Sequence, residues 1–304
     1  MAFDRLALGR LGAWAHLDTL PIDEARDFAR RADQLGYGTL WVPETVGRDP
    51  MVLLGLLAGA TTSIKLGTGI VSIWGRDAET MRMSAMTLQE ATAGRLVLGL
   101  GVSHPHLAEK LRGHAFDRPL TRMREYLAAY RSAIYKGPMP AEAVGAPPIV
   151  LAALRERMLG LAAAETDGAF PYLVTSRRVA EIRAILDGAV ASADAPRATL
   201  AVSLPVALSH DHAAARAAAR AYLAPYLRTP TYHASWTLQG FDEADWQKPG
   251  SDRLVEEMVV CGGVELVRAR VGEMLRAGAD HVALIPLAAD GTTDRLATLE
   301  ALAE

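Results

Sequence analysis

A helix that ends at a glycine, followed almost at once by an apolar strand, recurs along the 304-residue chain. Glycine after a helix adopts the left-handed conformation at little steric cost. A short, unbroken apolar run is typical of a strand buried on both faces, as in a parallel sheet. The pattern lies at residues 32–42, 90–101, 163–174 and 275–287. This alternation of helix and strand predicts an α/β fold.

Eight strands can be placed, with helices in most of the intervals between them. They are predicted at residues 8–14, 39–43, 65–72, 96–101, 148–152, 169–174, 199–206 and 281–287. Eight such units favour a (β/α)8 TIM barrel over an open, doubly wound sheet. Domains of about 150 residues would give two in this chain. One α/β barrel takes about 250 residues, so we expect a single barrel domain over residues 1–304.

Two intervals are longer than a barrel needs, at about 104–119 and 207–262. Each follows a strand, so we expect two helical insertions at the C-terminal mouth, where barrel active sites lie. The aromatic residues of the longer one could line a pocket, form a dimer surface or pin the insertion onto the barrel. They are Tyr222, Tyr226, Tyr232, Trp236, Phe241 and Trp246.

Composition restricts the partners. Lys and Arg total 32 against 35 Asp and Glu, a net charge of −3, which argues against nucleic acid or an anionic membrane. The one cysteine, Cys261, excludes an intrachain disulfide and a cysteine-cluster metal site. No apolar run is long enough to span a membrane, and the N-terminus has no apolar core of a signal peptide. We therefore expect a cytoplasmic protein.

Familiar catalytic motifs are missing. There is no Walker-type phosphate loop, no HExxH and no GxSxG. The run LGLGVSH (98–104) has two glycines of a dinucleotide fingerprint and lacks the third. His104 and His106 are close, but a metal site would need a third ligand, so we expect no metal.

Three predicted strand ends carry the candidate site. Glu44 comes directly after an apolar strand and a proline, Gly67 and Gly69 lie inside a strand, and Ser103 and His104 follow a third. Glycine within a strand often marks a bulge or a close approach of the backbone to a ligand. Because the ends of barrel strands converge at one mouth, we expect these residues to meet there.

Each residue also has a structural interpretation. Glu44 could cap a helix or pair with Arg48, and the glycines could fit a crowded barrel interior. His104 could be a solvated loop histidine.

A fourth candidate is the start of a helix at Arg155. Free N–H groups and a partial positive charge at a helix N-terminus suit a phosphate, and Arg155 and Arg157 would add cationic donors. Alternatively, both arginines are solvated or pair with Glu156 and Glu165.

The whole chain resembles the luciferase-like monooxygenase superfamily, which comprises flavin- and deazaflavin-dependent barrels. The resemblance rests on motifs that follow one another in order along the chain. WVPETVGRDP, GLGVSH and FPYLV resemble the branch described as probable coenzyme F420-dependent oxidoreductases. The wider motifs are GYGTLWVPE (36–44), IKLGTGIVSIWGRD (64–77), ATAGRLVLGLGVSH (91–104), RPLTRMREYL (118–127), AALRERMLGLAAAETDGAFPYLV (152–174) and a tail over 250–287.

The resemblance implies a bulge with a non-proline cis peptide at Gly69–Ile70 or next to it, supporting the cofactor ring. It also implies a cofactor-contacting turn that ends at His104, where deazaflavin members often have a glutamate as proton donor. A histidine with a pKa of about 6.5 could do that work near neutral pH. The residues implied for cofactor binding are Trp14, Thr68, Gly69, Ile70, Val71, Gly101, Val102, Ser103, Leu154, Arg155 and Arg157. Trp14 and Trp74 could be walls of the ring site or plain barrel packing.

The chain departs from the family pattern at two positions. Many members have an acid followed by a histidine after the second strand, whereas Glu44 is followed by Thr45, which leaves Glu44 as the local acid or base. The phosphate turn usually has a glycine where Arg155 stands.

The resemblance implies an oxidoreductase that transfers hydride between coenzyme F420 and a small organic substrate, with His104 and Glu44 as catalytic residues. One alternative is an FMN-dependent monooxygenase on the same barrel, and another is a non-catalytic flavin- or ligand-binding barrel. The partner expected is a small molecule of unspecified identity, and the family suggests a homodimer.

Overall fold

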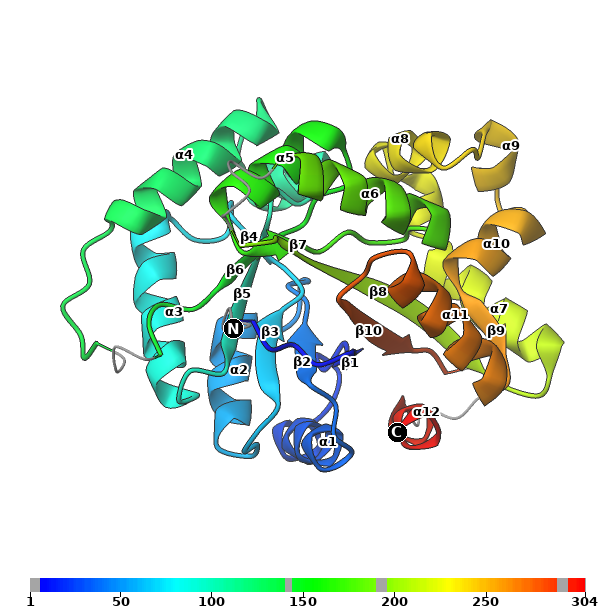
Figure 1. Cartoon of the computed structure of the whole chain (residues 1–304), viewed down its shortest axis with the longest axis horizontal. Coiled ribbons are helices and arrows are strands. Elements are labelled where there is room, and N and C mark those ends of the chain that lie inside the picture. The colour runs from blue at the N-terminus through cyan, green and yellow to red at the C-terminus, as the bar shows by residue number, and fades with distance from the viewer. Residues whose placement is uncertain (1–5, 140–143, 190–195, 289–294, 304) are drawn as a thin grey trace.

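The computed structural model describes residues 6–139, 144–189, 196–288 and 295–303 of the chain. Eight parallel strands close on themselves, because the last one, β10, pairs with both β8 and β1 (Figure 1). The predicted (β/α)8 barrel is therefore confirmed. In sheet order the strands are β1 (Leu11–Trp14), β2 (Thr39–Val42), β3 (Lys65–Thr68), β5 (Leu96–Gly101), β6 (Ile149–Leu151), β7 (Gly168–Ala169), β8 (Thr199–Leu208) and β10 (His281–Pro286).

Helices connect these strands and pack against their outer side (Figure 1). Several begin at an aspartate or threonine whose side chain accepts hydrogen bonds from the first turn, as at Asp49, Asp77 and Thr175. The helices of the ring are α1 (Ile22–Gln34), α2 (Pro50–Ala58), α3 (Ala78–Ala91), α4 (Pro119–Ser132), α5 (Glu156–Glu165), α6 (Ser176–Gly188), α11 (Val264–Arg276) and α12 (Arg295–Leu302).

The helix–glycine–strand pattern is correct at three of its four positions. Gly36, Gly94 and Gly278 have φ values of +81°, +84° and +107°. Gly168 is different, because it lies inside β7, where an added Cβ would come within 2.2 Å of the Thr199 carbonyl oxygen. Its role is close strand packing rather than ending a helix.

Strand β7 is also shorter than predicted. It stops at Ala169, and residues 170–174 continue as a loop. Pro171 has no N–H to donate to a neighbouring strand, and Leu173 has a φ of +54°, which turns the chain away from the sheet.

The predicted strand over residues 65–72 is interrupted. Its second part is β4 (Val71–Ser72), and the Gly69–Ile70 peptide bond between the parts is cis. Both parts pair with β5, where Gly67 faces Val97 and Val71 faces Leu100. One extra residue is thus inserted opposite β5, which is a β-bulge.

Both expected insertions leave the ends of strands. The first contains η1 (Leu107–Leu111) and leads to α4. The second consists of α7 (His212–Leu223), η2 (Tyr226–Arg228), α8 (Pro230–Leu238), α9 (Glu243–Trp246) and α10 (Asp252–Met258). It ends in a short strand, β9 (Val260–Gly262), that pairs with the last residues of β8, so residues 207–208 and 260–262 extend the sheet.

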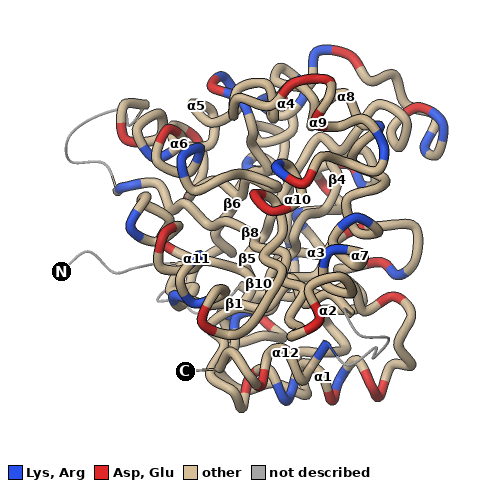
Figure 2. The backbone as a smooth tube through the Cα atoms, turned by 90° about the vertical axis from the view of Figure 1, so that its right-hand side faces the viewer, with Lys and Arg blue, Asp and Glu red and all other residues tan. Residues whose placement is uncertain are grey.

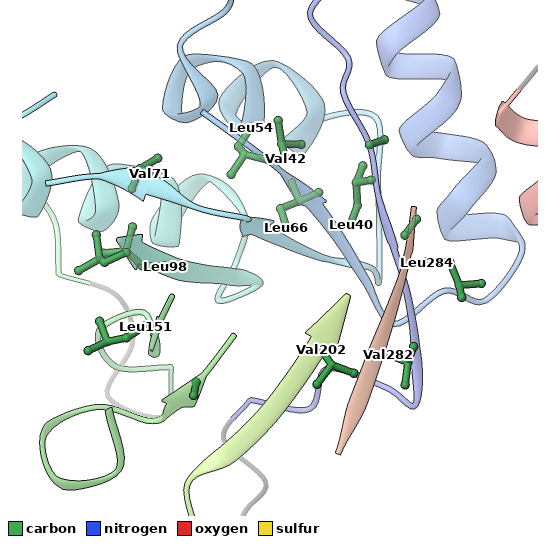
Figure 3. Packing of buried hydrophobic residues seen from close by; sticks show 14 of the residues in the cluster. Leu40, Val42, Leu54, Leu66, Val71, Leu98, Leu151, Val202, Val282 and Leu284 are labelled. Carbon is green, nitrogen blue, oxygen red and sulfur yellow. The ribbon is translucent and has the colours of Figure 1, made fainter. Parts of the chain in front are cut away.

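The core has two layers because side chains alternate along each strand. Leu40, Val42, Leu66, Val282 and Leu284 belong to the layer between strands and helices (Figure 3). A separate cluster fills the barrel interior and includes Trp41, Val97, Val150, Phe170 and Ala283.

The barrel interior is arranged around Trp41 and His281. The Trp41 indole N–H donates to His281 Nε2 at 3.0 Å, and His281 Nδ1 lies 2.7 Å from the Gly9 carbonyl. Burial lowers the pKa of His281 to about 4, so this imidazole is neutral and donates from Nδ1. Small residues make room for these rings, since a Cβ on Gly67 would meet the Trp41 ring at 2.4 Å.

Lys and Arg alternate with Asp and Glu along the outer helices and loops (Figure 2). Within the described ranges, no helix is both long and apolar enough to cross a membrane.

Candidate active site

A cavity of about 360 Å³ lies where the strand ends meet the two insertions. The strand-end residues around it come from β1, β2, the β3–β4 bulge, β5, β6 and β7, which follow one another in the sheet. The lining residues are Trp14, His16, Pro43, Glu44, Thr45, Gly69, Ile70, Val102, Ser103, His104, Leu107, Phe116, Pro119, Ala152, Ala153, Leu154, Arg155, Met158, Phe170, Pro171, Tyr172, Tyr226, Thr231 and Tyr232.

A larger hollow of about 630 Å³ lies elsewhere, on the outer surface of the long insertion. All its lining residues come from 227–248, and no strand end reaches it. We therefore take the cavity at the mouth as the candidate site, because catalytic groups of barrels sit at strand ends.

The bulge at Gly69–Ile70 forms one wall, and its polar backbone groups are held from several sides. The Trp14 indole N–H donates to the Gly69 carbonyl at 2.9 Å. Gly69 N donates to the Val42 carbonyl at 2.8 Å, and Glu44 N donates to the Ile70 carbonyl at 3.0 Å. The ends of β1 and β2 thereby fix the position of the bulge.

The Glu44 carboxylate also holds the bulge. Its Oε2 accepts a hydrogen bond of 2.6 Å from Ser72 N, and its Oε1 lies 3.0 Å from Arg76 and 3.1 Å from Arg112. The side chain is only 8% exposed. Arg112 belongs to the 104–119 insertion, so this carboxylate joins the bulge, the start of α3 and the insertion.

These contacts change the interpretation of Glu44. The pairing considered with Arg48 does not form; the partners are Arg76 and Arg112. Two guanidinium groups and a backbone N–H already donate to the oxygens of this carboxylate, so its acceptor positions are occupied by protein groups. We therefore propose a positioning role for Glu44, whereas the sequence predicts an acid or base role.

The turn after β5 brings Val102, Ser103 and His104 to the cavity. Ser103 has a φ of +58°. The His104 ring lies 5.4 Å from the ring of Tyr232, and its Nδ1 is buried with no hydrogen-bond partner in the described residues. His104 is therefore a partly enclosed cavity residue rather than a solvated loop histidine.

The expectation that His104 keeps a pKa near 6.5 is corrected. Burial, with a smaller contribution from nearby His106, lowers the pKa of His104 to about 4. The imidazole is therefore neutral at pH 7 and can accept a proton there. Burial lowers the pKa of His16, on the same cavity wall, in the same direction.

The turn between β6 and α5 provides Leu154 and Arg155, both in the lining. Arg155 is the N-cap residue of α5, and its backbone carbonyl accepts from Met158 and Leu159. The guanidinium of buried Arg178 donates to the Leu154 carbonyl at 3.1 Å and so fixes the turn from behind. Glu165, considered as a partner for these arginines, pairs instead with Arg124 and Arg131.

Four of the residues expected at the cofactor lie outside the lining: Thr68, Val71, Gly101 and Arg157. Thr68 is buried, and its hydroxyl donates to the Gly99 carbonyl at 2.8 Å. Val71 packs in the outer core layer, and Arg157 is exposed. A Cβ on Gly101 would meet Ile70 Cδ1 at 2.6 Å, so Gly101 makes room for the bulge.

The two tryptophans considered as walls differ. Trp14 lies in the lining. Trp74 lies outside it and donates its indole N–H to the Val102 carbonyl at 2.8 Å, which supports the turn from behind.

Sequence reasoning missed several cavity residues, notably His16, Phe116 and Tyr172. His16 closely follows the strand predicted over residues 8–14, so the signal used for Glu44 and His104 could have found it. Tyr172 lies inside the strand predicted over residues 169–174, and it reaches the cavity because β7 ends early, at Ala169. For Tyr226 and Tyr232 the sequence left three roles open, and both face the cavity. Trp236 and Phe241 instead lie in the core of the insertion and pin it.

In the described part of the chain, no group of His, Cys, Asp and Glu side chains could hold a metal ion. Cys261 is a free thiol on β9, outside the cavity lining.

Comparisons with known proteins agree with the barrel fold. The model of the family described as luciferase-like monooxygenase matches residues 1–281. The chain is 26% identical to "Putative coenzyme F420-dependent oxidoreductase Rv3520c" of Mycobacterium tuberculosis, over 88% of this chain and 91% of that protein.

Two solved structures share the fold. The coenzyme F420-dependent tetrahydromethanopterin reductase of Methanopyrus kandleri superposes with a TM-score of 0.77 at 16% identity, over 97% of each chain. The FMN-bound oxygenating constituent of 3,6-diketocamphane monooxygenase from Pseudomonas putida gives a TM-score of 0.73 at 16% identity, over 96% of this chain and 95% of that one.

The positioning role of Glu44 can be tested by Glu44→Gln. The substitution leaves Arg76 and Arg112 without the charge between them, and it weakens the bond to Ser72 N. A hydrogen bond to a charged group contributes about 1.5–3 kcal/mol, so we expect the free energy of unfolding to fall by about 2 kcal/mol in urea titrations. Glu90→Gln, an exposed site on α3, is the matched control. Equal stability of the two variants would contradict the assignment.

The lowered pKa of His104 predicts its titration directly. Nuclear magnetic resonance of the histidine rings should show His104, identified by its absence in His104→Gln, titrating near pH 4. The fold opposes protonation of this ring, so its contribution to stability is complete above pH 6.5 and declines as the pH falls toward 4. A midpoint near 6.5 would show that the ring is solvated.

Proposed function

The chain belongs to the luciferase-like monooxygenase family, and we propose that it is an oxidoreductase that transfers hydride between coenzyme F420 and a small organic substrate. The observation that carries the proposal is the Gly69–Ile70 bulge, which forms a cavity wall and is braced by Trp14 and Glu44. At Gly69 the wall is backbone alone, which leaves room for a flat deazaflavin ring beside Ile70.

The residues present fit such a ring. A Cβ on Gly69 would meet the Trp14 indole nitrogen at 2.7 Å, so only glycine allows Trp14 and the bulge to approach. Ile70, Val102 and Ser103 would contact the ring from neighbouring strand ends, as expected from sequence. When bound, the deazaflavin supplies a carbon centre that gives or takes a hydride.

The turn at Leu154 and Arg155 fits the phosphate of the cofactor. The α5 N-terminus provides backbone N–H groups, and Arg155 provides a cation at the cavity rim. Because the net charge of the chain is −3, the attraction for phosphate comes from this turn rather than from the overall field.

The protein's part in the reaction is to orient the reactants and to move a proton. His104 lies on the turn beside the ring position, and its neutral imidazole accepts a proton as hydride leaves an alcohol or a comparable donor. In the opposite direction, the protonated His104 imidazole would return this proton to the substrate. Glu44 keeps the bulge in place and takes no part in the proton transfer.

Two alternatives share the same barrel. An FMN-dependent monooxygenase is supported by the FMN-bound structure of the same fold. A non-catalytic flavin- or ligand-binding barrel is supported by Thr45 at the position where many members have histidine: its hydroxyl is hydrogen-bonded to Asp18.

Cofactor titration separates the first alternative. Purified protein is titrated with coenzyme F420 and with FMN while the cofactor's fluorescence is followed. We expect F420 to bind more tightly, and Arg155→Ala to weaken its binding by about tenfold, the loss of one charge-assisted hydrogen bond. Arg157 is the exposed second residue of α5, and the Arg157→Ala variant shows whether this arginine also contributes to F420 binding. Tight FMN binding without F420 binding would refute the proposal.

The non-catalytic alternative is tested by His104→Ala. In an enzyme this variant should keep its affinity for F420 and lose most of its turnover with any substrate found. Unchanged turnover would show that His104 has no catalytic role.

We also propose that the protein is a homodimer, as the family suggests. Val52 and Leu56 on α2 and Met83 on the adjacent α3 are large apolar side chains exposed to solvent. Light scattering should give about twice the chain mass of 32.5 kDa, and Leu56→Glu should shift the protein toward the monomer. A monomeric mass for the unaltered protein would contradict the proposal.

A further inference from the structure

Four tyrosines gather where the long insertion meets the cavity. Tyr172 follows β7, Tyr222 lies in the last turn of α7, Tyr226 begins η2 and Tyr232 lies on α8. Tyr172, Tyr226 and Tyr232 line the cavity, whereas Tyr222 lies behind them. The Tyr172 hydroxyl is hydrogen-bonded to the Tyr222 hydroxyl and lies 3.0 Å from the Tyr226 hydroxyl. The proposed function gives these four hydroxyl groups no part in cofactor binding or proton transfer.

Counting protons shows that this cluster has a donor to spare. Tyr172, Tyr222 and Tyr226 carry three hydroxyl protons, and the two hydrogen bonds of the Tyr172 hydroxyl use two. The Tyr222 and Tyr226 hydroxyls also interact with each other, so a ligand acceptor competes with this contact for the third proton. Tyr222 lies outside the lining, so its proton is best used toward Tyr172, because a buried donor without a partner is costly. Tyr172 then donates to Tyr226, and the Tyr226 proton is left for an acceptor in the cavity.

Tyr232 lies beside Tyr226 in the cavity lining and carries a second hydroxyl. Its ring packs edge-on against Tyr226, with centroids 5.1 Å apart, and faces the His104 ring. Among the described residues, its hydroxyl has no hydrogen-bond partner. Burial raises the pKa of all four tyrosines above the usual value of 10, so these hydroxyls are neutral donors at physiological pH.

The charge of this part of the cavity limits what can bind there. Arg76 and Arg112 are both paired with Glu44, and Arg155 lies on the β6–α5 turn proposed to hold phosphate. The neighbouring walls are apolar and include Leu107 and Phe116. A carboxylate or phosphate placed beside the tyrosines would therefore be desolvated without a cation to balance it.

We propose that the Tyr226 and Tyr232 hydroxyls form a subsite for the oxygen atom of an uncharged carbonyl compound or its alcohol. This inference rests on the proposed function, because these two compounds differ by one hydride and one proton and are thus the two forms of one hydride-transfer substrate. The subsite fixes the oxygen by hydrogen bonding and rejects anionic analogues. Its neighbour His104 would then face the same oxygen.

Three probes of similar shape test the subsite by ligand-observed nuclear magnetic resonance. Cyclohexanone has the acceptor oxygen, methylenecyclohexane replaces it with a carbon, and cyclohexanecarboxylate carries a charge. We expect the full-length protein to prefer cyclohexanone to methylenecyclohexane by about three- to tenfold, the range of one neutral hydrogen bond, and to bind the carboxylate most weakly.

The substitutions Tyr226→Phe and Tyr232→Phe should each reduce this preference, and the double variant should abolish it. Tyr130→Phe is the control, because Tyr130 is a buried tyrosine on α4 that lies outside the lining. Circular dichroism checks that each variant is folded, and the rotamer-conserving Phe keeps the ring packing.

Some outcomes would overturn the subsite. They are equal affinity for cyclohexanone and methylenecyclohexane, no binding of cyclohexanone at high millimolar concentration, tightest binding of the carboxylate, or an unchanged preference in the double variant. F420 titration of the same variants distinguishes this failure from failure of the proposed function. Normal F420 binding with no ketone preference refutes the subsite alone, whereas absence of F420 binding in the unaltered protein refutes the proposed function.

Discussion

The Glu44 carboxylate is the interaction on which the geometry of the mouth depends. It accepts from Ser72 N behind the bulge and carries the charge that balances Arg76 and Arg112. Arg76 also reaches Asp49 at the start of α2. A single buried group therefore sets the bulge, the beginning of two helices and the first insertion relative to one another. A buried charge with this many partners favours one arrangement, since removing it leaves Arg112 without its carboxylate partner and Arg76 with Asp49 alone.

This arrangement divides the cavity by charge. Following the sheet from β3 to β7, the wall changes from the Gly69–Ile70 backbone through neutral His104 to the cationic turn at Arg155, and then to the Tyr172 cluster. The phosphate-bearing tail of a cofactor and an uncharged substrate would therefore bind at the ends of different strands. This division of charge arises locally, from the N-terminus of α5 and from the pairing of Arg76 and Arg112 with Glu44. It therefore needs no strong overall field, and a chain of almost neutral net charge can maintain it.

The barrel, and the end of it where the candidate cavity lies, could be predicted from the sequence, because both follow from local signals. The helix–glycine–strand pattern identifies the strands, and strand ends of a barrel must converge. The contacts of Glu44 could not be predicted, because its partners are distant in sequence: Arg112 lies 68 residues away. The pKa of His104 was missed for the same reason, since its burial depends on Tyr232 of the second insertion. The sequence pattern shows which side chains reach the mouth of the barrel. Only the packed structure shows which of their polar groups are not already bonded to other protein groups.

The same distinction separates residues that contact a ligand from residues that hold those contacts in place. Thr68 and Trp74 belong to motifs that resemble the family, yet each uses its polar group on the backbone of a neighbouring strand or turn, at the Gly99 and Val102 carbonyls. A motif preserves such supports and the contact residues together, because losing either displaces the wall. The tyrosine cluster lies mostly in the insertion, where no strand register fixes the sequence. The resemblance can therefore indicate the class of cofactor, a flavin or a deazaflavin, whereas the substrate has to be inferred from the hydroxyl groups that the insertion places at the cavity.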